Sequence, residues 1–129
     1  MQKPQFSIYD VTLKGVGLKG IDLDVTLDVY NPNNVPIILD RATFDVYVND
    51  IKIGTGNLPQ AISIPANSHE YPRIALTVSY EGSLTGGWEY IKGKLFGGKT
   101  QLKIEGNAYV NVPILGEVTV PFSYSKEIS

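Results

Sequence analysis

The most specific chemical pattern in the chain covers residues 93–100, which read GKLFGGKT. It matches the phosphate-binding pattern G-x-x-x-x-G-K-[ST], in which backbone amides and a lysine, here Lys99, hold phosphate groups. Such a loop must follow a buried parallel strand and open a helix, so that the helix dipole also points at the phosphate. In this chain a helical pattern precedes the segment and a strand pattern follows it. We therefore expect a helix end and a strand start here, and no nucleotide site.

Two other sets of residues could do chemistry. His69 is the only histidine, and no serine lies in a Gly-x-Ser-x-Gly turn, so an exposed loop histidine is expected rather than a catalytic base. Asp22, Asp24 and Asp28 could supply oxygen ligands for Ca²⁺. Alternate residues on one strand face lie ~6.5–7 Å apart, which is too far for them to share an ion without help. The spacing favours a solvated acidic row that discourages edge-to-edge pairing. We expect no catalytic residue, cofactor or metal site.

The aspartates belong to a segment, residues 20–30, in which aliphatic and polar side chains alternate. Its aliphatic residues are Ile21, Leu23, Val25, Leu27 and Val29. Because successive side chains of a strand point to opposite faces, this alternation predicts a half-buried core strand. Elsewhere, solvent exposure of one ring face is expected for Tyr30, Tyr47, Tyr71 and Tyr109, but these rings do not identify a ligand.

The core strand stops at residues 31–36, which read NPNNVP. Pro32 cannot donate a hydrogen bond to a strand ladder, and it keeps Asn31 out of the helical region. Asn33 suits a turn and can bond the backbone through its side chain, and Pro36 leads into the next strand. Asn31, Pro32, Asn33 and Pro36 are therefore predicted to form a structural turn, with a functional role as the less favoured reading.

Composition limits the classes of protein to which the chain can belong. With 129 residues, of which 43% are hydrophobic and 19% charged, it should fold as one domain, residues 1–129. The net charge of −2, without clustered Lys and Arg, argues against a nucleic-acid partner. The absence of cysteine excludes disulfides and thiolate metal sites. No apolar run approaches the ~20 residues of a membrane span, so we expect a soluble chain. The sequence does not indicate its oligomeric state.

Alternating patterns predict strands in eight segments: residues 5–13, 20–30, 37–48, 51–58, 61–64, 69–80, 99–112 and 114–125. Asn49-Asp50 is predicted to form a two-residue hairpin turn. Residues 83–95 instead have apolar side chains at helical spacing, which predicts one short helix. We therefore predict a mainly β fold, an immunoglobulin- or fibronectin III-like antiparallel sandwich of about seven or eight strands with one helix.

Four segments carry a family resemblance: LDVTLDVYNPNNVPI (residues 23–37), TFDVYVN (43–49), IGTGNLPQAISIPANS (53–68) and ILGEVTVPFS (114–123). Together they resemble the water stress and hypersensitive response (WHy) domain of the atypical, folded late embryogenesis abundant proteins (group 2). The resemblance implies a WHy-type β-sandwich and a non-enzymatic role in desiccation or other abiotic stress. It implies client proteins or membrane surfaces as partners, and no catalytic residue or cofactor. Many relatives carry an N-terminal anchor, so the localisation, cytoplasmic or tethered, stays open.

Two other functions are compatible with the sequence. The first is an immunoglobulin-like binding or accessory domain, tethered in its full-length form, that recognises protein or carbohydrate. The second is a nucleotide-binding enzyme that uses Lys99.

Overall fold

The computed structural model describes residues 1–80 and 99–128. Within them the chain forms nine strands: β1 (Gln5–Val16), β2 (Gly20–Tyr30), β3 (Ile37–Val48), β4 (Ile51–Asn57), β5 (Ile62–Ile64), β6 (His69–Glu70), β7 (Arg73–Tyr80), β8 (Thr100–Val112) and β9 (Gly116–Ile128). The mainly β prediction is therefore confirmed for the described residues. The helix predicted over residues 83–95 lies outside them.

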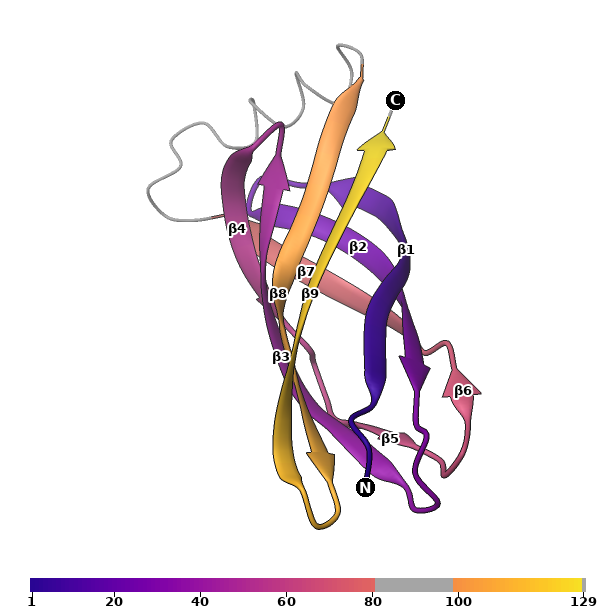
Figure 1. Ribbon diagram of the computed structural model, residues 1–129. Coiled ribbons are helices and arrows are strands. Elements are labelled where there is room, and N and C mark those ends of the chain that lie inside the picture. Colours follow the sequence, from indigo (N-terminus) through magenta and orange to yellow (C-terminus); the bar gives the residue numbers. More distant parts are fainter. Residues whose placement is uncertain (81–98, 129) are drawn as a thin grey trace.

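All pairings between neighbouring strands are antiparallel, and the order is β1-β2-β7-β4-β3-β8-β9, with β5 beside β3 and β6 beside β2. The sheet closes on itself into a barrel-like shape with one seam, where β1 lies next to β9 (Figure 1). This differs from the predicted sandwich of two separate sheets, and an immunoglobulin or fibronectin III fold is not confirmed. The reason is a short ladder between β4 and β7, in which Gly54 pairs with Tyr80 and Thr55 with Ser79.

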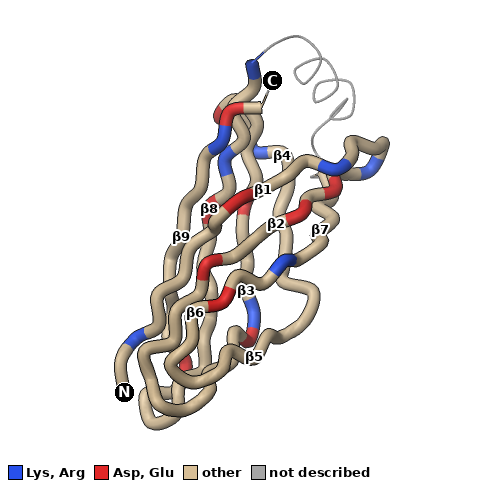
Figure 2. The backbone as a smooth tube through the Cα atoms, turned by 90° about the vertical axis from the view of Figure 1, so that its right-hand side faces the viewer, with Lys and Arg blue, Asp and Glu red and all other residues tan. Residues whose placement is uncertain are grey.

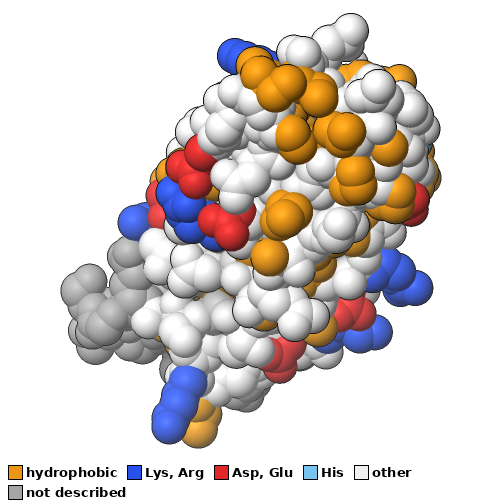
Figure 3. All heavy atoms as spheres, turned by 90° about the horizontal axis from the view of Figure 1, so that it is seen from below, with side chains coloured by type: hydrophobic (Ala, Val, Ile, Leu, Met, Phe, Trp, Pro, Cys, Tyr) orange, Lys and Arg blue, Asp and Glu red, His pale blue; other side chains and the backbone are white. Residues whose placement is uncertain are grey.

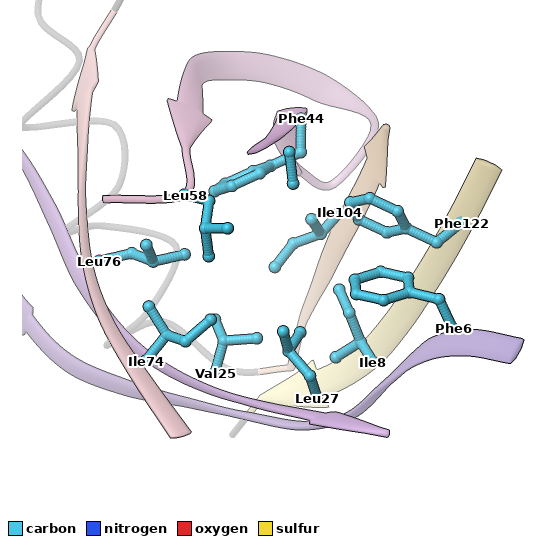
Figure 4. A pocket seen from close by; sticks show the side chains of 11 residues that line it. Phe6, Ile8, Val25, Leu27, Phe44, Leu58, Ile74, Leu76, Ile104 and Phe122 are labelled. Atoms are coloured by element: carbon cyan, nitrogen blue, oxygen red, sulfur yellow. The ribbon is translucent and has the colours of Figure 1, made fainter. Parts of the chain in front are cut away.

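The core lies between the two walls of this sheet. All five aliphatic side chains of β2 are buried, so the prediction of a core strand is confirmed. A cavity of about 30 Å³ remains among apolar side chains that include Phe6, Phe44 and Phe122 (Figure 4). This volume is far below the ~300 Å³ of a small ligand site, and the lining offers a water molecule no polar partner. The cavity is therefore a dry packing defect.

Local turn and bulge chemistry agrees with the sequence patterns at two places. Asn49 and Asp50 have φ values of 49° and 67°, and they close the hairpin between β3 and β4 as predicted. Along residues 5–13 the apolar positions change from even numbers (Phe6, Ile8) to odd numbers (Val11, Leu13). The structure has two register shifts in β1, between Ile8 and Asp10 and between Leu13 and Gly15.

Most predicted strand limits shift by a few residues in the structure, and two differences have a clear local cause. The strand expected over residues 69–80 is divided into β6 and β7 around Pro72, whose carbonyl accepts a hydrogen bond from the backbone of Leu27. The strand expected from Ile114 begins two residues later. Ile114 belongs to the turn between β8 and β9, which it and Gly116 close with φ values of 75° and 78°.

Polar and aromatic contacts hold the seam between β1 and β9. Lys126 on β9 donates from Nζ to the Val11 carbonyl at 2.7 Å and to the Asp10 carboxylate at 3.0 Å. The Tyr124 hydroxyl donates to the same carboxylate at 3.3 Å. Further along the seam, Phe6 packs against Phe122 with ring centroids 5.3 Å apart. Side-chain contacts therefore take the place of a backbone ladder at the seam.

We expect Asp10→Asn to weaken the fold at neutral pH but not in acid. The hydrogen bond from Lys126, helped by the Val11 backbone and Tyr124, holds the pKa of Asp10 below its ordinary value of 3.8 in spite of burial. A carboxyl group with a lowered pKa stabilises the fold above its unfolded pKa, and this contribution is lost as the pH falls through the folded pKa. Solvent screens the pair, so the loss at pH 7 should be below about 1 kcal/mol.

Urea unfolding of the Asp10→Asn variant and the wild type at pH 7 and about pH 2 measures this effect. Asp50→Asn is the control, because Asp50 lies in an exposed turn away from the seam. A stability difference for Asp10→Asn that stayed the same at both pH values would contradict the proposed role of the carboxylate.

Candidate functional site

The buried residue Asn31 joins two loops through its side chain. Its Nδ2 donates to the carbonyls of Val35 at 2.9 Å and Pro65 at 3.0 Å, and to that of Ile64 at 3.4 Å. Its Oδ1 accepts a hydrogen bond from the backbone nitrogen of Asn33 at 3.0 Å. The side chain is fully buried. It therefore satisfies backbone groups that would otherwise be buried without a partner.

Asn33 extends this network to the N-terminal segment. Its Oδ1 accepts from the Gln2 nitrogen at 2.7 Å, and its Nδ2 donates to the Gln2 carbonyl at 2.9 Å. Its own carbonyl accepts from the backbone nitrogen of Asn67 at 2.9 Å. We call Asn31 and Asn33, with the three segments that they join (residues 1–4, 31–36 and 64–68), the asparagine clamp. Pro32 and Pro36 lie in the turn of this clamp, half-buried and exposed respectively.

An apolar surface lies at the same end of the molecule as the asparagine clamp. It consists of four exposed side chains that we call the apolar end: Met1, Ile38, Ile114 and Leu115. Figure 3 views this end directly and shows hydrophobic side chains gathered over much of it. Ile114 is 91% exposed, and the other three are 44–45% exposed. Large apolar side chains grouped in this way mark surfaces that contact other molecules.

Ile114 carries both exposure and backbone strain. Its φ of 75° is rare for a β-branched residue. Strained residues cost about 1–3 kcal/mol and cluster at functional sites. The alternation placed Ile114 in a strand, although Pro113 and Gly116 nearby are typical turn residues.

Figure 2 marks the acidic positions along β2 in red. Their side chains have partners on the neighbouring strands. Asp22 accepts from the Thr77 hydroxyl at 2.9 Å, Asp24 lies 3.7 Å from Lys14, and Asp28 lies 2.5 Å from His69. The acidic row was predicted to discourage edge-to-edge pairing. β2 is instead paired on both sides, by β1 and β7, so the row does not lie at a sheet edge. Within residues 1–80 and 99–128, no three His, Cys, Asp or Glu side chains are grouped to hold a metal ion.

His69 is exposed, as predicted, but it belongs to β6 and contacts other rings. It stacks on Tyr71 with centroids 4.9 Å apart, and Tyr30 lies at 5.8 Å. Tyr9 meets Tyr71 edge-on at 5.4 Å. The expected exposure of Tyr30 and Tyr71 is confirmed. The structure places no serine or cysteine near His69 in a catalytic arrangement among the contacts of the described residues.

The described part of the phosphate-loop pattern does not have the required geometry. Lys99 is exposed and lies 3.6 Å from Glu127 on β9. Thr100 opens β8, one residue after the predicted strand start, whereas a phosphate loop requires its threonine to open a helix. Residues 93–98 lie outside the described residues.

Comparison with known proteins decides the family. The family model of the late embryogenesis abundant proteins matches residues 26–126, a range that includes the asparagine clamp residues Asn31 and Asn33. This chain belongs to the late embryogenesis abundant (LEA) family. The LEA chain is also 26% identical over 128 residues to a desiccation-related protein of Craterostigma plantagineum, covering 99% of this chain and 82% of that protein.

Solved structures share the fold of this LEA chain. The solution structure of an Arabidopsis thaliana protein matches with a TM-score of 0.73 and 25% identity, over 99% of this chain and 82% of that one. The crystal structure of a protein from Archaeoglobus fulgidus matches with a TM-score of 0.66 and 15% identity, over 95% and 96% of the two chains. The second likeness concerns the fold alone.

Within residues 1–80 and 99–128, the LEA chain has no helix long and apolar enough to cross a membrane.

Proposed function

We propose that this LEA chain is a non-enzymatic, stress-associated protein of the WHy type, which protects client proteins from aggregation during desiccation. Its family membership and its likeness to a desiccation-related protein support the stress-associated role. The observation that carries the mechanism is the apolar end, a group of exposed apolar side chains at one end of a folded sheet. We propose that residues 1–129 act as one unit.

A partner that binds the apolar end would bury apolar side chains that otherwise contact water. Burial of apolar surface contributes roughly 25 cal/mol per Å². A client protein that loses structure exposes apolar surface of its own, and covering that surface removes the contacts through which clients aggregate. The asparagine clamp supports the end, because it joins the Met1 segment and the turn before Ile38 to the rest of the fold.

Drying and rehydration of a labile enzyme tests this function. The enzyme is dried with the LEA chain or with an equal mass of an inert globular protein, and residual activity and light scattering are then measured. We expect less scattering and more activity with the LEA chain. Equal values with the inert protein would contradict a protective role. Leakage from dried lipid vesicles is a second readout, and protection of vesicles alone would replace client proteins by membrane surfaces as the partner.

Ile114→Asn should separate protection from stability. Asparagine tolerates positive φ better than isoleucine, so the variant should be more stable by about 1 kcal/mol. The variant also loses an apolar side chain whose burial against a client would contribute ~1.5 kcal/mol or more to binding. The concentration of the LEA chain needed for half-maximal protection should therefore rise about tenfold.

Leu18→Asn is the matched control for the Ile114 variant. Leu18 is 76% exposed and lies in the loop between β1 and β2, at the opposite end of β2 from the asparagine clamp. It should leave protection unchanged. If both variants lowered protection equally, or neither did, the apolar end would not be the contact surface.

A further inference from the structure

A hollow of about 310 Å³ lies on the outer face of β3, β4 and β8. We call it the polar trough, and six outward side chains form its walls: Thr43, Asp45, Thr55, Asn57, Glu105 and Asn107. The residues pair across the strands in two rows, with Thr55, Asp45 and Glu105 in one, and Asn57, Thr43 and Asn107 in the other. The volume lies at the lower end of the range for small-molecule sites.

The floor of the polar trough is a row without outward side chains. Phe44 points into the core and pairs with Gly56 on one side and Gly106 on the other. A Cβ atom at Gly56 would lie 2.4 Å from the Phe44 ring, which shows that the ring covers the inner side of this glycine. Backbone therefore forms the floor, and the polar side chains stand on both sides of it.

The charges in the trough are compensated in pairs. Asp45 lies 3.5 Å from Lys52, and Glu105 lies 3.9 Å from Lys103. Burial, together with the nearby Glu105 carboxylate, raises the pKa of Tyr47. An ionic ligand would have to displace these pairs, so the trough is suited to a polar ligand without charge.

The uncharged walls are available for hydrogen bonding. The side chains of Thr43, Thr55, Asn57 and Asn107 have no side-chain hydrogen bond to any other residue in the described part of the chain. Amide and hydroxyl groups each donate and accept, which is the pattern that a hydroxyl-rich ligand requires.

Aromatic rings stand at both ends of the two rows. Tyr47 follows Asp45 on β3 by two residues, and Tyr109 follows Asn107 on β8 by two residues, so both rings share the outward face. A cation lies over each ring, Lys103 at 4.7 Å from the Tyr47 centroid and Arg41 at 4.1 Å from that of Tyr109. The rows that carry these rings are six residues apart along β8, or ~20 Å.

We propose that the polar trough binds a short neutral oligosaccharide, with its hydroxyl groups on the two polar rows and its C–H faces toward the flanking tyrosines. Such a ligand carries no charge to disturb the Asp45 and Glu105 pairs. It also matches the mixture of donors and acceptors with apolar ring surface. The site is open and polar, so a dissociation constant in the millimolar range is expected. The proposal does not depend on protection by the apolar end, which lies elsewhere.

Titration of the ¹⁵N-labelled full chain with cellotriose, maltotriose and trehalose, followed by NMR, tests the trough. We expect at least one sugar to shift the amides of residues 43–45, 55–57 and 105–107. Asn107→Ala should weaken that binding about fivefold or more, since one lost hydrogen bond is worth about 1 kcal/mol.

Asn111→Ala is the matched control, because Asn111 lies on the same strand and face as Asn107 but outside the trough. It should bind the sugar as the wild type does. Three results would overturn the proposal: no shift with any of the three sugars, equal binding by the Asn107 variant and the wild type, or shifts at these amides with CaCl₂ alone. Unchanged thermal unfolding of both variants shows that a loss of binding is not a loss of fold.

Discussion

Asn31→Ala should destabilise the protein by about 3–5 kcal/mol. The substitution removes the donor for the carbonyls of Val35, Ile64 and Pro65 and the acceptor for the Asn33 amide. A buried polar group left without a partner costs about 1–3 kcal/mol, and partial relaxation with water entry offsets part of the sum. The effect should appear as a lower midpoint in urea unfolding at an unchanged slope.

Two further variants show whether hydrogen bonding is the cause. Asn31→Asp has the same shape, but it places a carboxylate oxygen opposite carbonyl oxygens, so it should destabilise at least as much as Asn31→Ala. Asn34→Ala, three residues further along the same turn, removes an exposed side chain and should change stability by less than about 0.5 kcal/mol. One net hydrogen bond is worth about 1 kcal/mol. If the losses of unfolding free energy in Asn31→Ala and Asn34→Ala differed by less than about that amount, the role of the clamp would be contradicted.

Gly106→Ala is expected to have the second large effect, about 3 kcal/mol or more of destabilisation. A Cβ atom at Gly106 would lie 2.0 Å from the Thr43 carbonyl oxygen and 2.6 Å from the Phe44 Cα. Both are backbone atoms of β3, so the clash cannot be relieved by turning a side chain. The strands β3 and β8 would have to separate, and amide exchange of β3 should become faster.

Gly15→Ala is the control for Gly106→Ala. The nearest atom to a Cβ at Gly15 is a carboxylate oxygen of Asp22 at 3.5 Å, which is an ordinary contact. This variant should be neutral or stabilised by up to about 1 kcal/mol. If Gly106→Ala unfolded at the same urea concentration as Gly15→Ala, the close approach of β3 and β8 would not be a constraint on the fold.

Local patterns predicted what local physics determines. The alternation in β2 identified its buried face, and Asn49-Asp50 identified a hairpin turn, because both depend on neighbouring residues alone. The turn at Asn31 was also expected from Asn and Pro chemistry. The partners of this turn were not predicted, because they are distant in sequence. Gln2 is 31 residues from Asn33, and Pro65 is 34 residues from Asn31.

Topology explains the remaining differences. Strand periodicity does not show which edges meet, so the two-pair ladder between β4 and β7 and the seam between β1 and β9 were not predicted. For the same reason the polar trough was not predicted, because β8 is far in sequence from the β3–β4 hairpin beside which it lies. Ile114 differs for another reason: the alternation outweighed the turn residues Pro113 and Gly116, and its positive φ runs against the preference of a β-branched residue.

The contact surface itself can be located by NMR of the methyl-labelled chain mixed with a client protein that is losing its structure. We expect the methyl signals of Ile114, Leu115 and Ile38 to lose intensity through contact with the large client. Those of Leu18 and Ile51, which are also exposed but lie at the opposite end, should keep theirs. Equal loss at both ends, or loss confined to Leu18 and Ile51, would contradict a protective role of the apolar end.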